Sequence, residues 1–221
     1  MPSLLMSDSS PDALPVLAAS EVRVLGALFE KALSTPDAYP LTVNALVAAC
    51  NQKSNREPVV AYDAPEVEAA LARLIGRRLA AEQTGMGMRV AKYRALAGGV
   101  YDLTSADKAV LAELMLRGPQ TASELRARCA RMHTFATPAD VEAVVERLAT
   151  RQAPLVAELP GRREPRWAHR LAGEPDPDAD DAPIAPSSTT SVGALSDDVE
   201  ALRARIEALE TAFEAFRQQF E

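Results

Sequence analysis

The residues best suited to contact a nucleic acid cluster in the segment CNQKSNREPVV, which spans residues 50–60. Lys53 and Arg56 are long cations that could reach phosphate oxygens from this segment. The Asn and Ser residues of the same segment can close turns by hydrogen-bonding to nearby backbone, so the segment also fits a purely structural role. The residue types alone leave both interpretations open.

Two arginine pairs also have a spacing that suits phosphate contact. Arg73 and Arg77 lie four residues apart, and Arg147 and Arg151 repeat the pair 74 residues later. Like charges at this spacing repel each other on a helix, and no acidic residue lies three or four positions before any of them. Phosphate contact would explain the pairs, and so would the general preference for positive charge at the C-terminus of a helix.

A third group of cations flanks two glycine-containing segments that we expect to form the tips of β-hairpins. Basic residues on such hairpins contact the minor groove or the backbone of DNA in some proteins, although solvated arginines are also common on small domains. With the residues above, they complete the candidate nucleic-acid contacts: Lys53, Arg56, Arg73, Arg77, Arg89, Lys92, Arg147, Arg151, Arg162 and Arg163.

The chain lacks motifs for catalysis, metal binding and cofactor binding. It contains no GxSxG, no Walker loop and no HExxH, and we expect His133 and His169 to be solvated or locally hydrogen-bonded. Cys50 and Cys129 lie in apolar segments without a CxxC spacing, which predicts buried free thiols. We therefore expect a non-enzymatic protein with no cofactor and no metal.

Charge is distributed unevenly along the 221 residues. Residues 20–172 carry 21 Lys and Arg against 17 Asp and Glu, whereas the remainder carries 3 basic and 14 acidic residues. The body is therefore mildly basic and can accept an anionic partner, although the net charge of the whole chain is -7. Neither a signal peptide nor a membrane-spanning apolar run is found, so we expect a cytoplasmic protein without a membrane partner.

The chain contains an internal duplication. The segment YPLTVNALVAAC at residues 39–50 aligns with GPQTASELRARC at 118–129, and VEAALARL at 67–74 aligns with VEAVVERL at 141–148. Two copies of one small domain are therefore predicted. In place of residues 50–60 the second copy has the shorter ARMHTFATP, which lacks the Lys-Ser-Asn-Arg run. That difference favours a role for this run that is special to the first copy.

Each copy has the pattern of a winged helix-turn-helix domain. Apolar residues at helical spacing open the copy, and a short extended segment then leads to a Thr that can cap a second helix, Thr42 or Thr121. A third amphipathic helix and two extended stretches close the copy. Tyr93 and Trp167 occupy equivalent positions in the two hairpins, and we expect them to anchor the core rather than stack on bases.

The third helix of such a domain normally reads the major groove with its first residues. In this chain those first turns carry acidic residues, Glu66 and Glu68 in the first copy and Asp140 and Glu142 in the second. Carboxylates suit the N-terminus of a helix but repel phosphate. Ordinary sequence reading by these helices is therefore disfavoured.

The predicted fold class is mainly α with small β-hairpin wings, an α+β arrangement of two tandem winged helix-turn-helix domains plus a C-terminal coiled-coil helix. The coiled coil is predicted because apolar residues recur at alternating spacings of four and three from Leu195 to Phe220. The predicted organisation is a disordered N-terminus at 1–19, winged-helix domain 1 at 20–98, winged-helix domain 2 at 99–172, a disordered acidic linker at 173–194 and the coiled-coil helix at 195–221.

Two segments resemble a known family. EVRVLGALFEKALSTPDAYPLTVNALVAACNQKSNREPVV at 21–60 and LMLRGPQTASELRAR at 114–128 are similar to the YceH-like family of bacterial tandem winged-helix proteins. The resemblance covers roughly residues 20–172 and implies the fold and dimerisation, but no reaction. The acidic linker and the C-terminal tail lie outside it.

Two functional hypotheses follow. The first is a non-enzymatic DNA-binding or DNA-associated regulatory protein, a homodimer in which the basic surfaces of duplicated winged helices contact the phosphate backbone. The second is a protein–protein interaction module that uses the winged helices as a docking scaffold, without DNA binding. The duplicated fold and the repeated arginine pairs make the first the leading hypothesis. The acidic starts of the third helices and the weak net charge of the body are the grounds for the second.

Overall fold

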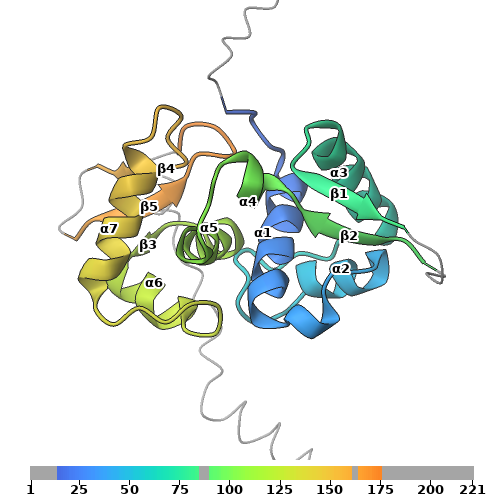
Figure 1. The fold of residues 1–221 in the computed structure, drawn as a ribbon, viewed down its shortest axis with the longest axis horizontal. Coiled ribbons are helices and arrows are strands. Elements are labelled where there is room, and N and C mark those ends of the chain that lie inside the picture. The colour runs from blue at the N-terminus through green and yellow to red at the C-terminus, as the bar shows by residue number, and fades with distance from the viewer. Residues whose placement is uncertain (1–13, 85–89, 161–163, 176–221) are drawn as a thin grey trace, which may run out of the picture. The chain divides into compact units, whose positions relative to one another are not determined.

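The computed structural model describes residues 14–84, 90–160 and 164–175, all of which lie within one compact unit. Helices and two small antiparallel sheets make it a mixed α+β fold, as predicted (Figure 1). In chain order the elements are α1 (Ala19–Ser34), η1 (Pro36–Ala38), α2 (Val43–Cys50), α3 (Ala64–Gly76), β1 (Ala80–Gln83), β2 (Lys92–Ala95), α4 (Ala97–Val100), α5 (Ser105–Arg117), β3 (Gln120–Thr121), α6 (Ala122–Cys129), α7 (Pro138–Ala149), β4 (Val156–Leu159) and β5 (Arg166–His169).

Several sequence predictions fall outside the described residues. These are the residues before position 14, the contacts proposed for Arg89, Arg162 and Arg163, most of the acidic linker and the coiled-coil helix at 195–221. At the N-terminal side the described chain begins earlier than expected. Leu17 belongs to the segment predicted as disordered, yet it is buried and its N–H donates to the carbonyl of Leu171 at 2.7 Å.

The second copy shows the complete predicted order of elements. Its helix α5 is followed by β3, the helices α6 and α7, and the strands β4 and β5, which form an antiparallel sheet in the order β3-β5-β4. In the first copy β1 pairs with β2, and the expected first strand is reduced to a single bridge between Leu41 and Tyr93. The short helix α4 joins the copies and was not predicted.

Helix starts follow the capping residues read from the sequence. The Thr42 hydroxyl accepts from the N–H of Ala45 at 3.3 Å, and Thr121 and Glu124 exchange the reciprocal hydrogen bonds of a capping box. Helix α7 has a further capping box between Thr137 and Asp140. These side chains satisfy backbone donors that a helix end leaves without partners, so they set where each helix begins.

A single hydrophobic core runs through both copies. Helices α1 and α5 pack side by side at its centre (Figure 1). Both helices bury most of their residues. Gly26 of α1 allows this close approach, because a Cβ atom at this position would lie 3.0 Å from Cβ of Met115. Tyr93 and Trp167 pack against the core from the two sheets, which confirms them as core anchors.

Replacing Gly26 tests whether this helix contact holds the copies together. We expect Gly26→Val to lower the free energy of unfolding by about 1–3 kcal/mol, because the added atoms overpack the contact between α1 and α5. Gly76→Ala is the matched control, since a Cβ at Gly76 meets nothing within 4 Å. It should leave stability unchanged or raise it by up to about 1 kcal/mol. Denaturant melts of both variants measure the difference, and equal stabilities would contradict this account of Gly26.

Candidate nucleic-acid interface

The segment of residues 50–60 lies between the two copies and contacts both. The N–H of Glu57 donates to the carbonyl of Leu116 on α5 at 2.8 Å, and Arg117 of α5 donates to the side-chain oxygen of Asn55. On the other side, the guanidinium of Arg23 on α1 donates to the carbonyl of Pro58 at 2.6 Å. The role special to the first copy is therefore at least partly structural, because this segment attaches that copy to α5.

Arg56 is the centre of this attachment and is not available to a phosphate. Its side chain is 0% exposed, and Nη2 lies 2.5 Å from Oε2 of Glu30, whose side chain is 2% exposed. A second bond joins Nη1 to Oε1 of Glu30 at 3.3 Å, while Nε and Nη2 donate to the carbonyl of Ala49 at 3.0 and 2.9 Å. The predicted phosphate contact is therefore wrong for Arg56. Lys53 is exposed and stays a candidate.

The charge of Glu30 is stabilised by its surroundings. Burial works to raise the pKa of its carboxyl, but the hydrogen bond and positive charge of Arg56 outweigh burial and lower that pKa. Lys31 at 3.3 Å and Arg131 of the second copy at 3.6 Å are further cations beside the same carboxylate. Glu30 is thus ionised at neutral pH and links cations from both copies.

The arginine pair of α3 meets a carboxylate at the start of α1. Glu21 is buried, its Oε2 accepts from the N–H of Ala18 at 2.7 Å, and its Oε1 lies 3.7 Å from Nε of Arg73 and 3.5 Å from Nε of Arg77. Both arginines remain partly exposed. They hold the third helix against the first, and phosphate contact by their exposed parts stays a prediction.

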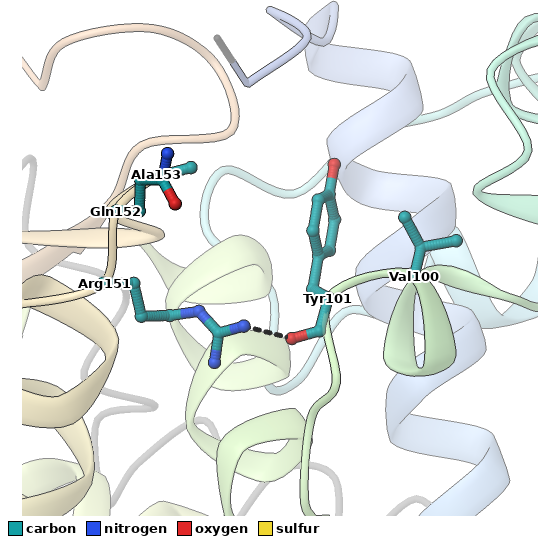
Figure 2. A pocket seen from close by; sticks show the side chains of 5 residues that line it. All are labelled: Val100, Tyr101, Arg151, Gln152 and Ala153. Carbon is teal, nitrogen blue, oxygen red and sulfur yellow. Dashed lines mark hydrogen bonds between the residues drawn. The ribbon is translucent and has the colours of Figure 1, made fainter. Parts of the chain in front are cut away.

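The second copy repeats this arrangement with α7 and α5. Asp107 in the first turn of α5 is buried, accepts from the N–H of Thr104 at 2.9 Å and pairs with Arg147. Arg151 donates to the carbonyl of Tyr101, as the dashed line in Figure 2 shows, at the edge of an open pocket of about 400 Å³. Sequence spacing missed these partners because each carboxylate lies tens of residues from its arginine.

The remaining candidates are placed only in part. Lys92 is half-buried on β2, while Arg89, Arg162 and Arg163 lie outside the described residues. Two exposed arginines that sequence reasoning did not select, Arg126 and Arg131, lie on α6 and on the turn before α7. The dense run RARCAR at 126–131 was the available signal for them.

The two cysteines and two histidines all lie among the described residues. Cys50 and Cys129 are buried free thiols, as predicted, and burial raises the pKa of each to about 12, so both stay protonated. His133 packs edge-on against Phe135 with ring centroids 4.6 Å apart. His169 differs from the prediction, because its Nδ1 atom is buried and has no hydrogen-bond partner among the described residues.

Residues 14–84, 90–160 and 164–175 contain neither a metal-binding cluster nor a membrane-spanning helix. No group of three or more His, Cys, Asp or Glu residues is placed to hold a metal ion. No helix in these ranges has both the length and the apolar character needed to cross a membrane.

Comparison with known proteins finds relatives along almost the whole chain. The model of a family described as "Protein of unknown function, DUF480" matches residues 17–166. A UPF0502 protein of Azoarcus sp. (strain BH72) is 46% identical and covers 96% of this chain and 98% of its own length. UPF0502 proteins of Geobacter sulfurreducens and Citrifermentans bemidjiense are 48% and 51% identical, covering 91% and 72% of this chain and 96% and 75% of their own lengths. The similarity thus includes both copies.

Substitutions at Arg56 and Lys53 separate a structural role from a surface role within one segment. We expect Arg56→Ala to lower the free energy of unfolding by about 3–5 kcal/mol, because it leaves the carboxylate of Glu30 buried and without its main partner. Lys53→Ala removes an exposed side chain and should change stability by less than about 0.5 kcal/mol. Denaturant melts at neutral pH compare the two variants. Similar losses of unfolding free energy in the two variants, or no loss in Arg56→Ala, would contradict the buried position of Arg56.

Proposed function

We propose a function for this chain on the basis of its fold and charges. The chain belongs to the DUF480 (UPF0502) family. The proposed function is that of a non-enzymatic, DNA-associated regulatory protein built from two winged helix-turn-helix domains. The observation that carries the proposal is the element order of the second copy. There α6 and α7 follow β3 and pack on α5, and the β4–β5 hairpin completes the three-stranded sheet. This is the arrangement in which a winged helix presents its third helix, here α7, to a DNA groove.

The charges around α7 favour contacts with phosphate rather than with bases. Arg126 and Arg131 precede the helix and are exposed, and Arg147 near its end is partly exposed. Between them, Asp140 and Glu142 are exposed on the first turns and would repel the negative backbone. We infer binding through the flanking cations, with weak sequence preference and a strong dependence on salt.

The rival function is protein–protein interaction, and one observation favours it. Glu66 and Glu68 on α3, like Asp140 and Glu142 on α7, are exposed at the helix starts that would face a nucleic acid. An acidic helix face suits a basic protein partner. DNA titration distinguishes the two proposals, because a protein-docking scaffold would not bind duplex DNA at low salt.

Dimerisation belongs to the same proposal. The apolar seam from Leu195 to Phe220 fits a coiled coil, and a homodimer would present four winged helices to a partner. Two weak phosphate-binding surfaces in one particle raise the overall affinity through effective concentration. The proposed protein is therefore a dimer whose DNA affinity depends on several modest contacts.

Titration of a labelled duplex at several salt concentrations tests the proposal. We expect binding with a clear negative salt slope, and the double variant Arg126→Ala/Arg131→Ala should flatten that slope by about 2, because it removes two phosphate contacts. Glu142→Gln is the control of opposite sign and should strengthen binding by reducing repulsion. Melting curves must show that the variants are folded. An absence of binding at about 50 mM salt contradicts the DNA proposal and supports the rival.

A further inference from the structure

A small cavity lies where the two copies meet, apart from the proposed DNA-binding surface on α7. Its volume is about 220 Å³, and its walls come from α1, residues 57–62, α5 and the end of β5. Val22, Val60, Leu114 and Met115 form an apolar lining. Since α1 belongs to the first copy and β5 to the second, both copies contribute to the walls of the cavity.

Arg23 is a buried cation that lines this cavity and forms no ion pair among the described residues, while the exposed Glu57 lines the cavity as well. Arg23 is only 4% exposed, and its Nη2 donates to the carbonyl of Pro58 at 2.6 Å. Its Nη1 has no hydrogen-bond partner and no carboxylate forms an ion pair with it among the described residues. Burial, followed by the repulsion of Arg56, lowers the pKa of Arg23. A buried cation that makes no ion pair is costly, so the position of Arg23 favours an anionic ligand.

A second polar side chain that lacks a hydrogen-bond partner at one atom lines the same cavity. His169 lines it, and the Nδ1 atom of the imidazole is buried without a hydrogen bond to any described residue. Burial lowers the pKa of His169 to about 4, so the ring is neutral at neutral pH. A neutral imidazole can still donate or accept one hydrogen bond. The cavity therefore offers one buried cation and one neutral imidazole beside its apolar lining, and the exposed Glu57 and the half-buried Tyr62 are its other polar side chains.

We propose that this cavity binds a small molecule that carries one carboxylate on a compact apolar body. The planar fork of a guanidinium matches the two oxygens of a carboxylate, and Arg23 supplies one charge for one anion. Glu57, which also lines the cavity, disfavours a dianion such as phosphate. The volume equals that of roughly seven waters at about 30 Å³ each, which limits the ligand to a few carbon atoms or one ring.

Benzoate is a suitable probe, with benzyl alcohol as the control that keeps the ring and lacks the charge. The full chain, labelled at its methionine methyl groups, is titrated with each compound to about 20 mM and followed by NMR. We expect benzoate to shift the methyl signal of Met115, which lines the cavity, but not that of Met132, which does not. Benzoate should also raise the melting temperature, because it binds only the folded state.

Variants decide whether Arg23 is the anion-binding group. Arg23→Gln should weaken benzoate binding by about tenfold or more, since it removes the charge-assisted hydrogen bonds. Arg73→Gln, an exposed arginine outside the cavity, should bind like the wild type. If Arg23→Gln does not fold, His169→Asn is used instead and should also bind more weakly. An unperturbed Met115 signal, equal binding of benzyl alcohol, or undiminished binding by the cavity variant that folds would overturn the proposal.

Discussion

The buried ion pair between Glu30 and Arg56 is the contact on which the packing of the two copies against each other depends. Glu30 lies near the end of α1, and Arg56 reaches it from a segment that also holds the last turn of α2 through the carbonyl of Ala49. Two desolvated charges of this kind are acceptable only when each has its partner and its hydrogen bonds. Because Arg56 is held in this way, Asn55 and Glu57 beside it are placed against α5.

Pairing of an arginine with a buried carboxylate recurs inside each copy and limits how many arginines can bind a nucleic acid. Glu21 and Asp107 occupy the first turns of α1 and α5, where each caps its own helix and meets an arginine from the third helix. The arginines for which the sequence indicated no acidic neighbour thus have partners in the folded structure. Around α7, the exposed Arg126 and Arg131 precede the acidic first turn of the helix, so the proposed DNA contact is modest and salt-sensitive.

Local features were predictable from the sequence, and long-range partners were not. Thr42 and Thr121 predicted where their helices begin, because a capping side chain bonds to a backbone N–H only three positions away. The role of Arg56 depends on Glu30, which lies 26 residues earlier and carries no sequence mark of the pairing. The cavity could not be predicted from the sequence for the same reason, since Arg23 and His169 line it from distant parts of the chain. The duplication revealed the repeated unit but not the single core that joins the copies.

Native-state hydrogen exchange tests most directly whether the two copies form one cooperative body. It measures the opening free energy of backbone amides in α3 of the first copy and α7 of the second. The account predicts equal values for the most protected amides of both helices, and an equal decrease in both when Arg56 is replaced by Ala. Separate opening of α3 while α7 stays protected, or a decrease confined to α3, would contradict it.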